Sequence, residues 1–224
     1  MPDLQFKIDG VEVIPYAASP QLAFKLRVDS GADDAGKPVA VHSVMLRCQI
    51  RLEPVQRRYD PAEQEQLQEL FGEPQRWGQT LRSMLWTNTM AVIPPFAGKT
   101  QVDLPIACTF DFNIAATKYF AALDSGEVPL SFLFSGTVFY ADENGSLQVQ
   151  QISWEREATF RLPISVWKKM MEMYYPNIAW LSVRQDVFDR LNAYRIQCGQ
   201  PTWEGALEHL LGGPEPKIER QVSL

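Results

Sequence analysis

Few side chains in this sequence could carry out nucleophilic or metal chemistry. The 224 residues include two histidines, His42 and His209, and three cysteines, Cys48, Cys108 and Cys198. Nucleophilic catalysis requires a histidine beside its nucleophile, and a transition-metal site requires clustered Cys, His and carboxylate ligands. Cys48 lies too far from His42 along an extended strand for direct contact. We therefore expect no catalytic residue, no metal site and no cofactor.

The short motifs of common enzyme and ligand sites are also missing. The sequence has no Gly-x-Ser-x-Gly elbow and no Gly-x-x-x-x-Gly-Lys-Ser/Thr phosphate loop. The acidic loop at 29–34 lacks a glycine and a terminal glutamate at the positions that an EF-hand requires. His209 lies near a helix end, where it would interact with the last carbonyls. Cys48 and Cys108 would meet only if their strands pair, which would give a poor partial metal site.

Composition limits the classes of partner and the compartment. The formal net charge is −6 and the isoelectric point is about 5.0, which argues against binding to nucleic acids or to anionic membranes. No apolar run is long enough to span a bilayer, and the first ten residues, MPDLQFKIDG, do not form a secretory signal. An odd number of widely spaced cysteines disfavours a disulfide framework. These features predict a cytoplasmic protein.

Much of the chain alternates with the period of antiparallel strands. Over 42–53, Val44, Leu46, Cys48, Ile50 and Leu52 point to one side, with polar residues and a methionine between them. The same period predicts further strands over 5–15, 21–28, 87–94, 101–112, 128–140, 147–154 and 158–162. Gly10 is expected at a bulge or turn, and Asp142-Glu143-Asn144-Gly145 at a hairpin turn.

Helical signals interrupt the strands and then follow them. Asp60-Pro61-Ala62-Glu63 is typical of a helix start, with a capping residue, a proline and a returning glutamate. We expect that helix to end at Gly72, a second one within 74–86, a third at about 115–123, and three more after Pro163, within 163–211.

These elements predict an α+β fold, in which an antiparallel sheet or sandwich of about seven to nine strands carries the helices. We expect a single domain over 1–211, with a helical insertion at 55–86 and a helical extension at 163–211 packed on the sheet. Residues 212–224 form a polar, proline-bearing tail that we expect to be flexible.

Two sets of residues are candidates for binding a protein partner. Arg47, Arg51, Arg57 and Arg58 are expected to form a basic face with Lys25 and Arg27 of a neighbouring strand. A face of this kind would suit an acidic partner, and Arg47 and Arg51 are its candidate contact residues. The helix after Pro163 carries more large, soft side chains than one face can bury. Its candidate contact residues are Trp167, Met170, Met171, Tyr174 and Tyr175. The alternative for the arginines is an ordinary polar side of a sheet. The alternative for the helix is that it is sandwiched between the sheet and the C-terminal helices.

The leading hypothesis is a non-enzymatic, protein-binding accessory or chaperone-like factor. One alternative is an enzyme or small-ligand-binding protein with a pocket between sheet and helices, lined by Trp77, Trp86 and Trp154. Another is a structural subunit of a larger complex. Association with a second copy of the chain is left open.

Four segments resemble an uncharacterised bacterial family, domain of unknown function 6084. They are VHSVMLRCQIRLEP at 41–54, LFGEPQRWGQTLRSMLWT at 70–87, LPIACTFDFNIAATKYFAALDSGEVPLSFLFSGTVFY at 104–140 and WEREATFRLPISVWKKMMEMYYPN at 154–177. The resemblance implies a short cytoplasmic protein encoded among accessory genes of nickel–iron hydrogenases. It therefore implies a role in assembly or maturation, with a hydrogenase subunit or another accessory protein as the partner. The family has no known catalytic motif, so no site residue is carried over.

A weaker resemblance concerns the fold of the export chaperone SecB. The order of the expected elements is similar to that of SecB: a strand, an arginine-rich strand, another strand and then a helix that ends near Gly126-Glu127-Val128-Pro129-Leu130. The insertion at 55–86 and the terminal helices depart from that pattern. This departure puts both a SecB-like tetramer and a SecB-like client groove in doubt.

Overall fold

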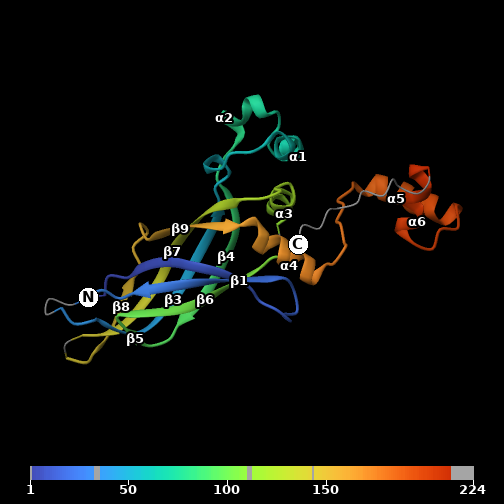
Figure 1. Ribbon diagram of the computed structural model, residues 1–224. Helices are drawn as coiled ribbons and strands as arrows, with labels where there is room; N and C mark the ends of the chain where they lie inside the picture. The colour runs from blue at the N-terminus through green and yellow to red at the C-terminus, as the bar shows by residue number, and fades with distance from the viewer. Residues whose placement is uncertain (1, 33–35, 110–112, 143, 213–224) are drawn as a thin grey trace, which may run out of the picture. The chain divides into compact units, whose positions relative to one another are not determined.

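The strands form two antiparallel sheets in a computed structural model that describes residues 2–32, 36–109, 113–142 and 144–212 (Figure 1). The smaller sheet has the order β1-β2-β6, with β1 at Gln5–Val13, β2 at Gln21–Asp29 and β6 at Lys99–Ala107. The larger sheet has the order β4-β3-β7-β8, with β4 at Met84–Ile93, β3 at Ala40–Leu52, β7 at Glu127–Ala141 and β8 at Leu147–Gln151. In addition, β5 (Phe96–Ala97) pairs with β3 and β9 (Glu157–Pro163) pairs with β7. Together with the helices, this is the predicted α+β class.

The core lies between the two sheets, which pack face to face. Phe24 of β2 meets Phe132 of β7 with ring centroids 5.2 Å apart, and Phe6 of β1 stacks on Phe134 of β7 at 4.4 Å. The alternation predicted for β3 is confirmed, since its five inward side chains are all buried. The predicted bulge at Gly10 is also confirmed, because the register between β1 and β2 shifts between Ile8 and Gly10.

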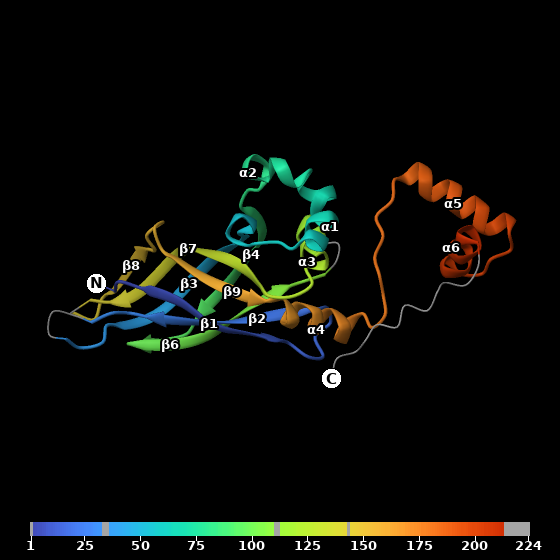
Figure 2. The same ribbon diagram turned by 45° about the horizontal axis from the view of Figure 1, so that its top comes forward.

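The insertion between β3 and β4 contains the predicted helix cap. Helix α1 (Pro61–Phe71) opens on Asp60, whose side chain accepts a hydrogen bond from the Glu63 N–H at 2.9 Å. Short 3-10 segments cover Pro54–Gln56 and Pro74–Arg76, and α2 is a single turn at Trp77–Thr80. The second insertion helix is thus shorter than expected, and β4 already begins at Met84. Helix α1 contacts α3 (Ile114–Ala121), as Figure 2 shows.

A buried ion pair fixes α1 to the turn before β7. The Arg57 guanidinium donates to Glu63 Oε1 at 2.5 Å, to the Ser125 carbonyl at 2.8 Å and to the Glu127 carbonyl at 2.9 Å. The same Glu63 oxygen accepts from the Asp124 N–H at 3.1 Å. Both charged side chains are almost completely buried, at 9% and 5% exposed. The local fold therefore depends on a charge pair as well as on apolar packing.

Helix α4 (Ile164–Tyr174) packs on the strands, mainly on β1. The Tyr174 hydroxyl donates to the Ile14 carbonyl at 2.7 Å and accepts from the Ala17 N–H at 2.8 Å. On the buried side, Trp167 stacks on Phe120 of α3 with centroids 5.3 Å apart. These contacts make α4 an integral part of the sheet-based core.

The chain divides into two compact units, Met1–Ile178 and Ala179–Leu224. The second unit contains α5 (Gln185–Gln197) and α6 (Trp203–Leu211), which meet through Phe188 and Trp203 at 5.2 Å and through Arg195, 4.7 Å above the Trp203 ring. The boundary follows α4, so the elements after Pro163 do not share one unit. A single domain over 1–211, with all of 163–211 packed on the sheet, stays a prediction. Apart from Gly212, the predicted tail at 212–224 lies outside the described residues.

Candidate functional site

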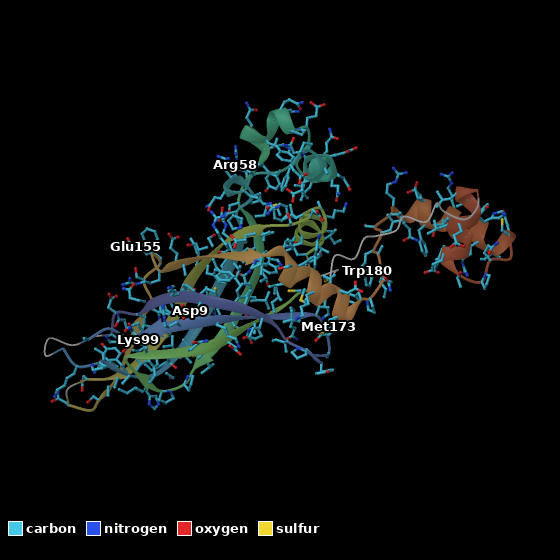
Figure 3. All side chains as sticks on the ribbon, in the orientation of Figure 1. Asp9, Arg58, Lys99, Glu155, Met173 and Trp180 are labelled. Atoms are coloured by element: carbon cyan, nitrogen blue, oxygen red, sulfur yellow. The ribbon has the colours of Figure 1, made fainter. Side chains whose placement is uncertain are left out.

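The outer face of the smaller sheet is a charged surface whose members are paired. Lys25 of β2 lies 3.1 Å from Glu12 on one neighbouring strand and 3.0 Å from Asp103 on the other. Arg27 lies 3.2 Å from Asp9, which is labelled in Figure 3. The hydrogen bonds that Lys25 donates to Asp103 and then to Glu12 raise the pKa of Lys25 above its usual value. Exposed cross-strand pairs of this kind are well solvated, so this face has little to gain from a partner.

The outer face of the larger sheet is different, because it exposes large apolar side chains on neighbouring strands. Met45 of β3 is 58% exposed, and Met90 and Val92 of β4 are each 71% exposed. On β8, Leu147 and Val149 are also exposed. Single exposed apolar residues are ordinary, but a contiguous group on one face indicates an interaction surface.

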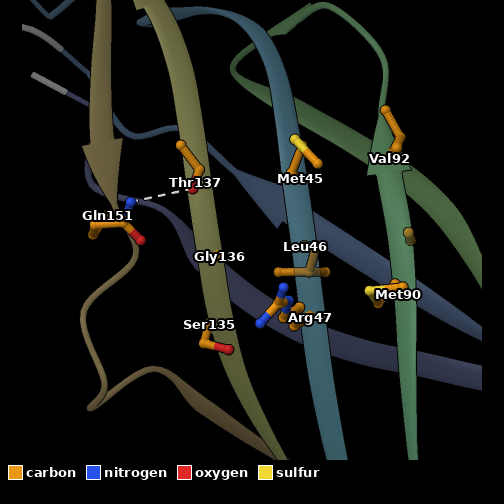
Figure 4. Close-up of a pocket in the computed structure, with 10 residues that line it drawn as sticks. Met45, Leu46, Arg47, Met90, Val92, Ser135, Gly136, Thr137 and Gln151 are labelled. Atoms are coloured by element: carbon orange, nitrogen blue, oxygen red, sulfur yellow. Dashed lines mark hydrogen bonds between the residues drawn. The ribbon is translucent and has the colours of Figure 1, made fainter.

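The strand register places Met45, Met90 and Val92, with their cross-strand neighbours, in two rows that line an open groove of about 500 Å³ (Figure 4). One row runs from Val92 through Met45 and Thr137 to Gln151, and the next from Met90 through Arg47 to Ser135. Gln151 donates to the Thr137 hydroxyl at 3.2 Å. The groove is apolar over β4, combines Met45 with Arg47 over β3, and is polar over β7 and β8. We call it the outer groove, lined by Met45, Leu46, Arg47, Met90, Ala91, Val92, Ser135, Gly136, Thr137 and Gln151.

Gly136 is the one lining residue that the backbone geometry requires. Its φ is +138°, and a Cβ built on it would lie 2.0 Å from the Met45 carbonyl oxygen of β3. No other residue could occupy this position without moving one of the two strands. A glycine inside a strand commonly marks such a close backbone approach.

Arg47 carries the positive charge of the outer groove. It is exposed between Met90 and Ser135, and Arg51 lies farther along β3, half-buried opposite Ser131. Among the residues whose placement is described, neither arginine forms an ion pair. A guanidinium without a carboxylate beside exposed methionines is typical of an interface rather than of a solvated sheet side.

The expected single basic face is wrong in its membership. Lys25 and Arg27 are on β2, in the smaller sheet, whereas Arg47 and Arg51 are on β3, in the larger sheet. The consecutive strands β2 and β3 belong to different sheets, and the Arg57 side chain of the expected face is buried in the ion pair with Glu63. The polar side of β2 therefore does not continue onto β3, and the two pairs of cations lie on different surfaces.

The aromatic and methionine side chains of α4 are divided between core and surface. Trp167 is 7% exposed and Met170 is 0% exposed, so both belong to the core in this structure. Met171, Tyr174 and Tyr175 are half-buried. This set lies on the helix that packs against β1, and the structure does not bring it together with Arg47 and Arg51. The side of α4 that carries Trp167 and Met170 is therefore buried, as the alternative of a core helix predicts.

The residues that could do chemistry are dispersed. His42 is exposed at a register shift of β3, whereas Cys48 and Cys108 are buried, and burial raises the pKa of both thiols to about 12. Cys48 is on β3 of the larger sheet and Cys108 directly follows β6 of the smaller sheet, and these two strands do not pair. Cys198 is exposed. Within the described ranges, no three His, Cys, Asp or Glu residues are grouped to hold a metal ion.

His209 in the second unit has a different neighbour from the one expected. Its Nδ1 forms a hydrogen bond with the hydroxyl of Tyr194 on α5, so the side chain links α6 to α5. The sequence spacing gave no signal for this pair, because the two residues meet only through the α5–α6 turn.

The three tryptophans expected to line a pocket do not surround one. Trp77 and Trp86 are buried in the core, and Trp154 is 84% exposed. Between the sheet and the helices, the cavity beside Trp86 and Trp167 measures about 10 Å³. A volume of this size holds about one water molecule. The sequence pattern does not predict the outer groove, although its alternation places Met45 and Arg47 on the same side of one strand.

Comparisons with known proteins give a family and two weak structural likenesses. The model of a family described as "Family of unknown function (DUF6084)" matches residues 1–219. The CARDB domain of the PF1109 protein from Pyrococcus furiosus, solved in complex with di-metal ions, is similar with a TM-score of 0.26 and 14% identity, over 72% of this chain and 92% of that chain. A β-glucosidase from Kluyveromyces marxianus gives a TM-score of 0.23 and 10% identity, over 72% of this chain and 15% of that chain. Scores this low support no argument about fold or function. No curated protein matches the sequence.

Proposed function

We propose that this chain, which belongs to the DUF6084 family of unknown function, is a non-enzymatic, protein-binding accessory factor. The observation that carries the proposal is the outer groove, where exposed Met45, Met90 and Val92 adjoin Arg47, which forms no ion pair with any residue that the structure describes. Methionine and arginine are enriched at protein interfaces, and methionine adapts to apolar surfaces of varied shape.

The contrast between the two outer faces supports this choice of surface. On the smaller sheet, the charged side chains already satisfy one another across strands. On the larger sheet, three large apolar side chains of adjacent strands contact water, and covering them would be favourable by about 25 cal/mol for each Å² buried. A partner that covers the second face gains this free energy without breaking existing pairs.

The alternative of a small-ligand protein has one observation in its favour, the groove volume of about 500 Å³. Ligand pockets of this volume normally enclose most of the ligand surface. The outer groove lies instead on an exposed sheet face, so a small ligand would remain open to solvent along one side. This geometry favours a macromolecular partner.

The partner that we propose is a nickel–iron hydrogenase subunit or another accessory protein of its assembly. This part of the proposal depends only on the family resemblance described above. The test is co-purification of the tagged chain from a hydrogenase-producing host, and recovery of no such protein above background counts against this assignment.

A site-specific crosslinking experiment tests the proposed surface. A photo-reactive amino acid is placed at Val92 on the outer face of the larger sheet, and in a control variant at exposed Gln101 on the outer face of the smaller sheet. We expect a defined protein adduct from the Val92 position, and its loss when Met45 is replaced by aspartate. Equal adducts at both positions, or none at Val92, would contradict the proposal.

None of the described helices is long and apolar enough to cross a membrane.

A further inference from the structure

We propose that the outer groove receives an amphipathic α-helix of the partner, with an apolar stripe flanked by a carboxylate that meets Arg47. This inference rests on the proposed function, since it names the chemistry of the segment that binds at the same surface. Three features of the groove support it: the state of the backbone beneath it, its charge and the spacing of its side chains.

The backbone beneath the groove excludes an added strand. Strand β3 pairs with β4 on one side and with β7 on the other, and β7 pairs in turn with β8 on its far side. At the centre of the groove, the main-chain N–H and C=O groups of β3 and β7 are therefore already hydrogen-bonded to neighbouring strands. A partner in extended form would leave its own N–H and C=O groups facing side chains. A helix satisfies its backbone internally and presents only side chains, as in other helix-in-groove complexes.

The charge of the lining selects a carboxylate. Apart from Arg47, the lining residues are neutral, and none of them is acidic. A partner carboxylate would form a charge-assisted hydrogen bond with the guanidinium, whereas a lysine would meet a like charge. The net charge of −6 on the whole chain opposes an acidic partner at long range. That repulsion is screened beyond about 8 Å at physiological ionic strength, so the local arginine decides the preference.

The spacing of the two rows exceeds the side-chain spacing of one helical turn by only about 1–2 Å. Residues two apart on a strand, such as Met45 and Arg47, lie about 6.8 Å apart along it. Side chains three or four residues apart on a helix are separated by about 5–6 Å. A helix aligned with β3 and β4 would thus set one apolar residue against the row of Val92 and Met45. Its next apolar residue would contact Met90, with a carboxylate on the flank directed to Arg47.

Fluorescence anisotropy with labelled synthetic peptides tests the inference on the full chain. The probes are helical peptides of about 18 residues with an identical leucine stripe. One carries glutamates along the flank of the stripe, one glutamines and one lysines. The protein variants are Arg47→Gln and Met45→Gln in the groove, and Arg27→Gln on the other sheet as a control with the same charge change. Arg47 has no described ion-pair partner, so its replacement leaves the fold intact.

We expect the glutamate peptide to bind most tightly. Arg47→Gln should weaken its binding by about three- to five-fold, as an exposed charge pair would. Met45→Gln should weaken all three peptides by about ten-fold, because it removes apolar contact from the stripe. Arg27→Gln should change nothing beyond about two-fold, and the preference for glutamate should disappear at about 1 M salt.

The outcomes separate this inference from the proposed function. Equal binding of the three peptides, with an effect of Met45→Gln alone, would overturn the acidic partner and leave the protein-binding surface standing. Absence of binding for every peptide, with a crosslink still formed at Val92, would overturn the helical partner but not the surface. If the chain self-associates in sedimentation and Met45→Gln abolishes this association, the occupant of the groove is a second copy of the chain. If a fatty acid binds saturably and the peptides do not, the occupant is a small ligand. Either result overturns the inference.

Discussion

Replacing Glu63 by glutamine tests whether the buried ion pair holds the insertion on the core. The change keeps the shape of the side chain but leaves the Arg57 guanidinium without its opposite charge. Arg57 would retain its bonds to the carbonyls of Ser125 and Glu127, while its Nε is already buried with no hydrogen-bond partner. A buried charge in this state is strongly unfavourable.

The magnitude follows from the burial of the pair. Breaking a buried ion pair by removing one partner costs about 3–5 kcal/mol. The glutamine oxygen can still accept from the Asp124 N–H, so we expect the lower end, about 3 kcal/mol. For a domain of this size, 1 kcal/mol corresponds to about 2–4 °C, which predicts a fall in Tm of about 6–12 °C. Circular dichroism during heating measures it.

The same helix provides the control. Glu69 pairs with Lys118, but the pair is exposed, so Glu69→Gln should cost less than about 1 kcal/mol. A second readout is Tyr59, whose hydroxyl lies 2.8 Å from that of Tyr119 and whose pKa is raised by burial to about 12. If α1 loosens in Glu63→Gln, ultraviolet titration should find this pKa nearer to 10. Equal Tm values for the two glutamine variants would refute the reasoning.

Three further predictions concern the cysteines, one glycine and one turn. A thiol reagent should modify Cys198 quickly, but Cys48 and Cys108 only after unfolding. The pKa of both buried thiols is about 12. Their contribution to the free energy of unfolding is therefore complete below about pH 8.5 and is lost as the pH rises toward 12. Gly136→Ala should lower the free energy of unfolding by more than about 2 kcal/mol, measured with urea, because the added methyl group would overlap the carbonyl of the adjacent strand. Hydrogen bonds from the backbone of the β7–β8 turn lower the pKa of Asp142, so Asp142→Asn should remove a stabilisation that is present above about pH 4 and is lost as the pH falls through the folded-state pKa.

The sequence predicted the strand faces well, because burial follows the period of two directly. The five inward residues expected on β3 are all buried, and the helix start at Asp60 and Glu63 forms the expected reciprocal cap. These features are local: each depends on a few consecutive residues and on the requirement to satisfy backbone groups near them.

The candidate surface was only partly predictable, because it depends on register and on sheet membership. Alternation places Met45 and Arg47 on one side of β3, but only the pairing of β3 with β4 brings Met90 and Val92 beside them. The helical period likewise could not show which side of α4 faces the core. Trp167 and Met170 are therefore buried, although their types are equally suited to an interface.

The most direct test of the proposed binding surface is an affinity measurement with the protein that crosslinks at Val92. Isothermal titration would compare the unmodified chain with Met90→Asp, on the outer face of the larger sheet, and with Gln101→Asp, on the outer face of the smaller one. We predict that Met90→Asp weakens binding at least about ten-fold and that Gln101→Asp stays within about two-fold. Equal affinities for the two aspartate variants would show that the partner binds elsewhere.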